Sequence, residues 1–317
     1  MLCPTCQNEA RRFGKDRYGN QRFQCEECRK TFSDRPVNAL GTMRLDLDKA
    51  VQCLELMVEG MSVRAIMRVT KVNRNTILDL LVMMGERCEK LLNGRIKGMA
   101  VVDVQCDEIW GFVGMKEKTR KRLKSEEDGV GDAYCFIGIE RTTKLIVSWH
   151  LGKRSSQDTY EFAQKLAAAT SGRFQVTTDG YRPYQTAIPA AFGSNVDFAQ
   201  LVKHYATKTD EGKYSPGEVT GTEKVPCCGN PNPEKICTSH IERQNLTIRM
   251  GSRRMTRLTN AFSKKWENHK AAMALHFAFY NFCRVHMTLK STPAVAAGME
   301  DHTWTIKELI EKTSTLA

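Results

Sequence analysis

The strongest constraint on the fold is the order of elements in the middle of the chain. Apolar, β-branched runs at residues 100–114, 134–139 and 145–151 predict three consecutive strands joined by hairpin-type connections. A helical pattern follows over residues 155–169, and residues 173–178 predict a fourth strand. We therefore expect an α/β domain that contains a mixed sheet with flanking helices.

Three acidic residues occupy favourable places in this pattern. Asp107 lies in the first predicted strand, Asp179 follows the fourth, and Glu242 opens a later segment of helical character. A sheet with a packed helix can bring the three carboxylates together, and carboxylates at such a junction hold magnesium, which acts on phosphates. They therefore predict a nuclease-like active site. A surface helix with ordinary ion pairs is the alternative interpretation of the segment around Glu242.

Other carboxylates compete as ligands, namely Asp103, Glu108 and Asp197. Asp103 lies four residues before Asp107 on the same face of the strand and is a possible substitute for it. Glu108 is expected to point to the opposite face, because side chains alternate along a strand. We therefore assign Asp107 as the ligand from this strand.

A strand meander, a helix and a further strand are the order of a ribonuclease-H-like core. In that fold the first and fourth strands are neighbours, so Asp107 and Asp179 are expected to share metal ions. Such a core fits within the predicted catalytic domain at residues 96–290.

The charge balance points to a polyanionic partner. Lys and Arg number 48 against 36 Asp and Glu, which gives a formal charge of +12 and a pI near 9.1. Nucleic acid is the leading candidate and a membrane surface the weaker one. The chain lacks an 18-residue apolar run and a signal peptide pattern, so we expect a cytoplasmic, nucleoid-associated protein without a membrane partner.

The first forty residues contain two CxxC pairs, Cys3–Cys6 and Cys25–Cys28, separated by 18 residues. This spacing predicts a four-thiolate zinc site in a zinc ribbon, residues 1–40, with redox thiols as the alternative. The ribbon has little apolar content, so the zinc is expected to be structural and needed for folding. Its basic hairpin is either a DNA contact or a solvated face.

Residues 41–95 have the pattern of a helix-turn-helix domain. Apolar spacing predicts a first helix from Leu47 to about Gly60, a short second helix capped by Ser62, and a longer third helix capped by Asn73. A plain three-helix bundle is the alternative. In the helix-turn-helix interpretation, base edges and phosphates are contacted by Arg64, Arg68, Lys71, Arg74, Asn75 and Thr76.

In order along the chain, the sequence contains the motifs CPTC, RFQCEECRKTF, CDEIWGFVG, TTDGYRPY, HIERQNLTIRM and RLTNAFSKKWENH. With these motifs the chain resembles the DDE transposases of the insertion-sequence-one type, over most of residues 3 to about 285. The resemblance implies an enzyme that binds the terminal inverted repeats of an insertion sequence. It would cleave and transfer DNA strands with two magnesium ions, or manganese, held by Asp107, Asp179 and Glu242. It also implies a homodimer or higher oligomer on double-stranded DNA.

A helical face after Glu242 is predicted to contact phosphates, and the resemblance places the stretch 245–257 along the transposon end. The expected DNA contacts there are Asn245, Arg249, Arg253, Arg254 and Arg257.

Several segments leave alternatives open. Residues 207–236 predict an inserted loop, and the thiols of Cys227, Cys228 and Cys237 with nearby His240 form either a second zinc site or free thiols. Basic residues 116–124 predict a long hairpin tip that contacts DNA or is merely solvated. Trp110 is expected in the core, with stacking near DNA as the alternative. A buried helix at residues 271–282 and a helical tail at 291–317 complete the chain.

Two other functions remain compatible with these features. A zinc-dependent DNA-binding regulator would use the DNA-binding modules without catalysis. A repair or junction nuclease would have the same core but would cut branched DNA. The acidic residues favour an enzyme over the regulator, and the two predicted DNA-binding modules favour a sequence-bound substrate over a branched one.

Overall fold

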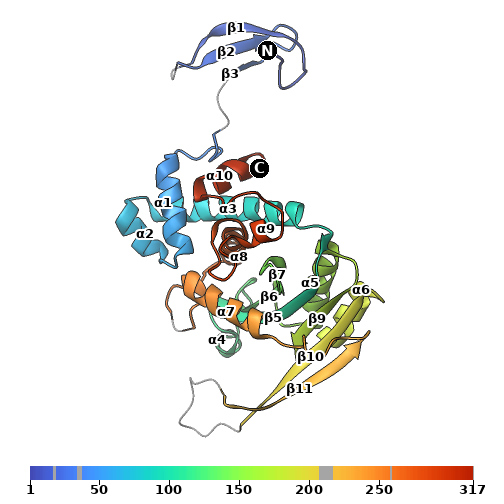
Figure 1. Ribbon diagram of the computed structural model, residues 1–317. Coiled ribbons are helices and arrows are strands. Elements are labelled where there is room, and N and C mark those ends of the chain that lie inside the picture. The colour runs from blue at the N-terminus through green and yellow to red at the C-terminus, as the bar shows by residue number, and fades with distance from the viewer. Residues whose placement is uncertain (17–18, 34–37, 207–216, 258, 317) are drawn as a thin grey trace. The chain divides into compact units, whose positions relative to one another are not determined.

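The computed structural model describes residues 1–16, 19–33, 38–206, 217–257 and 259–316 (Figure 1). The chain divides into two compact units, Met1–Leu47 and Asp48–Ala317.

The first unit is a small antiparallel sheet with the strand order β1-β2-β3. Its strands are β1 (Ala10–Lys15), β2 (Gln21–Cys25) and β3 (Thr31–Ser33). The rings of Phe23 and Phe32 stack across β2 and β3 with their centroids 5.9 Å apart. Among the described residues of this unit, the buried hydrophobic side chains are only those of Cys3, Cys25 and Leu40. The unit therefore has almost no apolar core.

The second unit opens with three helices in the predicted positions: α1 (Leu47–Val58), α2 (Val63–Thr70) and α3 (Arg74–Arg95). The side chain of Ser62 accepts a hydrogen bond from the backbone N–H of Ala65, and Asn73 accepts one from Asn75. Both predicted helix caps are therefore confirmed.

A six-stranded mixed sheet, in the order β11-β10-β9-β5-β6-β7, forms the centre of this unit. β5 is antiparallel to β6 and parallel to β9. β6 is antiparallel to β7, β9 is parallel to β10, and β10 is antiparallel to β11. The strands are β5 (Asp103–Val113), β6 (Gly131–Glu140), β7 (Ile146–Gly152), β9 (Phe174–Asp179), β10 (Val196–Tyr205) and β11 (Val219–Cys228). The predicted meander and the pairing of the first and fourth strands are confirmed. A separate two-stranded ladder joins β4 (Met99–Ala100) to β8 (Thr170–Ser171).

Helices cover both faces of the sheet. On one face lie α5 (Ser156–Ala169) and α6 (Tyr184–Phe192), which contact each other. On the other lie α7 (Ser239–Gly251) and α8 (Trp266–Ala278). The centre of the sheet is therefore buried between two helical layers, which explains why β7 is buried at all seven positions.

Two connections differ from the sequence-based expectation. The predicted inserted loop at residues 207–236 contains β11, which extends the sheet by pairing with β10; residues 207–216 lie outside the described part of the chain. The predicted basic hairpin tip contains a short helix, α4 (Glu117–Leu123), in which Arg120 pairs with Glu117. In both places the sequence is polar and charged because the element has no buried residue, so its regular structure was not predicted.

The C-terminal helices pack against α3. After α7 comes a short 3-10 turn, η2 (Arg253–Met255), and α8 continues into a π-helical turn, η3 (Phe279–Cys283). The predicted buried helix thus contacts α3 as well as the sheet, where Phe277 packs on Trp149 of β7. The tail forms α9 (Pro293–Ala296) and α10 (Ile306–Ser314), and α10 also contacts α3. The helix-turn-helix segment therefore shares its core with the C-terminal helices.

Gly85 permits the close crossing of α3 and α8. A Cβ atom at this position would lie 2.3 Å from the Cα of Ala271. We predict that Gly85→Ala destabilises the protein by about 1–3 kcal/mol, because the helices must separate to admit the methyl group. Gly94→Ala, in the same helix with no atom within 4 Å, should instead stabilise it by about 0.5–1 kcal/mol. Urea unfolding midpoints measure both effects, and equal midpoints for the two variants would contradict the packing argument.

Candidate active site, zinc site and basic groove

Three carboxylates converge where β5 and β9 run side by side. The parallel ladder pairs Cys106 with Thr178, so Asp107 and Asp179 follow at the same level of the sheet. One side-chain oxygen each from Asp107, Glu108 and Asp179 lies within 4.8 Å of the others. The structure therefore brings together two of the three sequence-predicted acids and adds a third carboxylate that we had set aside.

Glu108 joins this cluster from the opposite face of the sheet. As expected from strand alternation, its side chain points away from α7: it accepts a hydrogen bond from Arg154 at 2.7 Å and one from the Tyr184 hydroxyl at 3.2 Å. Its side chain is only 2% exposed. The β5–β9 ladder ends at Cys106 and Thr178, so no β9 partner covers this edge of β5 and the carboxylate can approach Asp179. The expected orientation of Glu108 is confirmed, and one of its carboxylate oxygens nevertheless lies within 4.8 Å of those of Asp107 and Asp179.

Burial and mutual repulsion raise the pKa values of the cluster. Burial, followed by the nearby charge of Asp179, raises the pKa of Asp107 to about 7. The same two causes raise the pKa of Glu108 to about 8, although Arg154 opposes the shift. The pKa of Asp179 is also raised, chiefly by burial. Three carboxylates that resist ionisation together form a site where an added cation is strongly favoured.

Glu242 lies beside this cluster but not within it. Its carboxylate forms an ion pair with Lys203 of β10, accepts a hydrogen bond from the Thr238 hydroxyl, and is 46% exposed. Its charge contributes to the raised pKa values of both Asp107 and Asp179, which shows that it is near them. The predicted third acid is therefore on the adjoining helix with its side chain turned toward Lys203.

Asn245 connects α7 to the cluster. Its side-chain N–H donates to Asp107 at 2.7 Å. Its carbonyl oxygen Oδ1 is buried and has no hydrogen-bond partner among the described residues. The predicted contact of Asn245 with DNA stays a prediction; the structure places its amide against a cluster carboxylate, with an acceptor available for a further donor.

The other competing carboxylates are engaged elsewhere. Asp103 is buried and paired with Arg141 at 3.1 Å. Asp197 is paired with Arg173 at 2.6 Å. Neither belongs to a group of potential metal ligands within the described residues.

A second cluster, His150, Asp158 and Glu161, lies between β7 and α5. Lys165 lies 3.2 Å from His150 Nδ1, and an ammonium group can only donate, so Nδ1 must accept this hydrogen bond. The ring proton is then on Nε2, which donates to Asp158 at 2.9 Å. The imidazole therefore directs a proton, rather than a lone pair, at the carboxylates, and this cluster is a hydrogen-bonded network at the edge of the core.

The four ribbon cysteines come together as predicted. Their sulfur atoms lie within 4.8 Å of one another, with Cys3 3.6 Å from Cys28 and Cys6 3.4 Å from Cys25. Backbone N–H groups point at two of the sulfurs, from Thr5 to Cys3 and from Cys28 to Cys25. Backbone hydrogen bonds lower the pKa of Cys3 to about 6. This cluster of thiols can hold a zinc ion.

The geometry does not favour the alternative of a second zinc site. No three of Cys227, Cys228, Cys237 and His240, all of which the structure describes, come within ligating distance of one another. The Cys237 sulfur instead accepts a hydrogen bond from Gln105 at 3.1 Å.

Residues from two distant segments line one basic groove of about 1320 Å³. One wall is the start of α2 and α3, and the other is the segment from η2 to the start of α8. Six cationic side chains line the groove against two anionic ones: Arg64, Arg74, Arg253, Arg254, Lys264 and Lys265 against Asp79 and Glu267. Four of those six cations are predicted DNA contacts, namely Arg64, Arg74, Arg253 and Arg254. A fifth predicted contact, Asn75, lines the same groove.

The remaining predicted DNA contacts divide into exposed and engaged residues. Arg68, Lys71 and Arg257 are exposed, and Thr76 is half-buried. Arg249 is half-buried and donates to the backbone carbonyls of Met255 and Trp110. Arg254 donates to Ser263 and to the Asn268 carbonyl, and burial lowers its pKa to about 10. Arg249 and Arg254 therefore hold the backbone of this region, whatever else they contact.

Trp110 is half-buried and lies in an aromatic row with Phe112, at 5.7 Å between ring centroids. Lys116 lies over the Trp110 ring at 5.6 Å. This side chain belongs to the edge of the core rather than to its centre.

Comparison with known proteins yields a distant structural likeness to solved structures. No protein-family model matches the chain, and no curated protein matches its sequence. Among solved structures it is similar to a piggyBac transposase in a synaptic complex with hairpin DNA, at 10% identity and a TM-score of 0.39. The match covers 88% of this chain and 72% of that chain. None of the helices in the described residues is long and apolar enough to cross a membrane.

We predict that removing zinc unfolds the ribbon while leaving the second unit folded. The ribbon has almost no apolar core, so metal–thiolate bonds must supply its folding free energy. Limited proteolysis of the full chain with a strong chelator should cut within residues 1–47, and Cys25→Ser should behave likewise without chelator. The exposed Cys227 region provides the control, because Cys227→Ser should leave the ribbon protected. A ribbon that stays protected in chelator would contradict a structural metal.

We predict that ionisation of the carboxylate cluster lowers the stability of the metal-free protein as the pH rises from about 6.5 to 8, above the range in which the buried His269 and His276 change stability in the opposite direction. The unfolded carboxyl pKa is about 4, whereas Asp107 and Glu108 have folded pKa values of about 7 and 8. In this window the folded state holds more protons than the unfolded state, so its stability falls as they are released. Thermal melts should show this slope, magnesium should reduce it, and Asp107→Asn should flatten it. Parallel curves for the variant and the native chain would contradict the assignment.

Proposed function

We propose that the protein is a DNA transposase of the DDE type, which binds the terminal inverted repeats of an insertion sequence and cleaves and transfers DNA strands. The observation that carries the proposal is the convergence of Asp107, Glu108 and Asp179 at the β5–β9 junction. A cluster of like charges that are costly to ionise together has a clear chemical use in binding divalent cations beside a phosphodiester.

The donor set fits magnesium or manganese, because it consists of oxygens. A bound divalent ion would neutralise charge on a phosphate and lower the pKa of a water molecule. Asp107 and Asp179 would hold it, and Glu242 would complete the site after exchanging Lys203 for the ion. The unpaired Asn245 Oδ1 beside Asp107 is suited to accept a hydrogen bond from a water molecule that a bound ion would hold.

The sheet topology supports a ribonuclease-H-like core for this enzyme. The first three strands of the unit's central sheet form an antiparallel meander, and the fourth returns parallel to the first with the fifth beside it. This is the order that we expected from the sequence, and it places the first two acids on neighbouring strands. The predicted domain limits at residues 40, 95 and 290 remain part of the proposal.

The basic groove supports binding to double-stranded DNA. It combines the N-terminal turn of α3, where helix-turn-helix proteins read base edges, with Arg253, Lys264 and Lys265 on the opposite wall. A net excess of cations along one groove matches the phosphate backbone. Two ends must be joined in one reaction, so the active form is proposed to be a homodimer or larger.

We predict that the protein nicks duplexes carrying the sequences that flank its coding region and joins the freed 3′ ends to a second duplex, with magnesium present. Asp179→Asn should reduce cleavage at least 10³-fold, because the site loses a charge that holds the ions, while DNA affinity stays unchanged. Asp197→Asn, which alters a carboxylate on the neighbouring strand outside the cluster, should cleave normally. End-labelled DNA on denaturing gels and a gel-shift titration measure both effects.

Each rival function gives a different result in that experiment. Binding without nicking, unchanged in Asp179→Asn, would indicate a regulator. Cutting of branched DNA without joining would indicate a repair or junction nuclease. As the converse control, Arg74→Ala in the groove should weaken binding by about 1–3 kcal/mol and leave cleavage of saturating DNA intact.

A further inference from the structure

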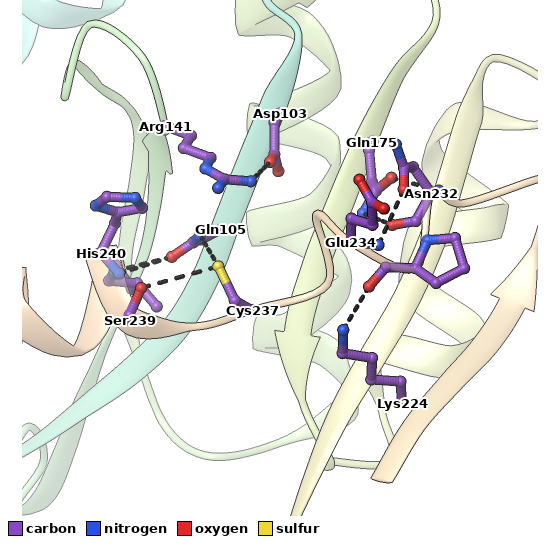
Figure 2. A network of polar contacts seen from close by, with 12 residues as sticks. Asp103, Gln105, Arg141, Gln175, Lys224, Asn232, Glu234, Cys237, Ser239 and His240 are labelled. Carbon is purple, nitrogen blue, oxygen red and sulfur yellow. Dashed lines mark hydrogen bonds and ion pairs between the residues drawn. The ribbon is translucent and has the colours of Figure 1, made fainter. Parts of the chain in front are cut away.

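A buried glutamine connects the strand that carries Asp107 to the helix that carries Glu242. Gln105 precedes Asp107 by two residues on β5, so both side chains point to the same face. Its side chain is fully buried. Figure 2 shows it between Cys237 and the backbone of His240, at the point where α7 begins.

Both the oxygen and the nitrogen of the Gln105 side-chain amide form hydrogen bonds at the start of α7. Its oxygen accepts the backbone N–H groups of His240 at 2.9 Å and Ile241 at 3.2 Å. Its nitrogen donates to the Cys237 sulfur at 3.1 Å. The first N–H groups of a helix have no partner within the helix, and Thr238, the residue at the cap position, makes no side-chain cap bond. Gln105 therefore supplies the cap of α7 from another element of the fold.

Gln105 and Asp107 hold α7 at two matching points. The two strand positions are separated by about 6.6 Å, at roughly 3.3 Å per residue. Their contacts on α7, at His240 and Ile241 and then at Asn245, are separated by about 6–7.5 Å, at roughly 1.5 Å per residue. The strand and the first turn of the helix thus run side by side, and Glu242 lies between the two points of attachment.

We propose that Gln105 is a positioning residue for Glu242: by capping the first turn of α7 it holds that carboxylate beside Asp107 and Asp179. This inference rests on the proposed function, in which Glu242 completes the metal site. With the backbone fixed, Glu242 would need only a rotation of its own side chain to exchange Lys203 for a bound cation. Without the cap, the first turn of α7 frays and the carboxylate is no longer held within reach.

The chain contains a matched control for this proposal. Gln175 is also buried, lies on the adjacent strand β9, and exchanges two hydrogen bonds with the backbone of Asn232. It therefore holds the same incoming segment (Figure 2), but ten residues before Glu242 and without contact to α7. A general loss of buried hydrogen bonds affects both glutamines, whereas loss of the α7 cap affects only Gln105.

The test compares Gln105→Met with Gln175→Met in the full-length protein. Hydrogen–deuterium exchange of peptides from α7 should increase at least tenfold in Gln105→Met and remain unchanged in Gln175→Met. Both variants should melt a few degrees lower. In cleavage assays only Gln105→Met should need at least tenfold more magnesium for half-maximal rate and show a lower kcat, with the KM for DNA unchanged.

Two results would overturn the proposal: unchanged exchange in α7 of Gln105→Met, or equal losses of metal dependence in both variants. If Gln105→Met does not fold, Gln105→Glu keeps an acceptor for both N–H groups and should retain native exchange in α7; faster exchange there would also overturn it.

Failure of the proposed function is distinguishable from failure of this inference. Mn²⁺ binding followed by electron paramagnetic resonance needs no DNA and no catalysis. A native chain that binds Mn²⁺ but does not cleave DNA would remove the proposed function, while weaker Mn²⁺ binding by Gln105→Met alone would still support the positioning role. Equal Mn²⁺ affinity in the native chain and Gln105→Met would overturn it.

Discussion

Repulsion between buried carboxylates is the constraint on which the candidate site depends. Asp107, Glu108 and Asp179 approach one another at half-buried positions, and their raised pKa values express the cost. The surrounding side chains reduce that cost only in part: Arg154 balances Glu108, and Asn245 donates to Asp107. The negative charge that these contacts leave uncompensated favours a site with a bound cation over an empty site in which all three carboxylates are ionised.

The parts of the fold that depend on local residue patterns could be predicted from the sequence. Hydrophobic alternation and the caps at Ser62 and Asn73 depend on near neighbours, so the helices and the meander were predictable. Glu108 was not, because its place in the cluster depends on where the β5–β9 ladder ends. β11 was not either, since an edge strand in which every residue is exposed or half-buried needs little apolar sequence.

The role of three buried glutamines was also not predicted from the sequence. Gln105, Gln175 and Gln200 lie on the adjacent strands β5, β9 and β10, and each binds backbone groups of a neighbouring segment. Gln200 donates to the carbonyls of Asp179 and Tyr181 and so holds the turn after the second acid. Glutamine has no strong strand or core preference, so only the three-dimensional contacts reveal that an amide with donors and an acceptor suits irregular backbone.

The crossing of α3 and α8 at Gly85 and Ala271 has a mechanical consequence. The α3 helix spans about 33 Å, at roughly 1.5 Å per residue. Its first turn lines the basic groove, and its middle packs closely against α8, which also contacts the sheet. Because α3 is one continuous helix, the distance along it from the groove to the crossing at Gly85 is fixed. On the proposed function, this rigid connection would fix the distance between the DNA-binding groove and the catalytic sheet. The number of base pairs from the recognised sequence to the cut would then be set by the protein and not by the DNA.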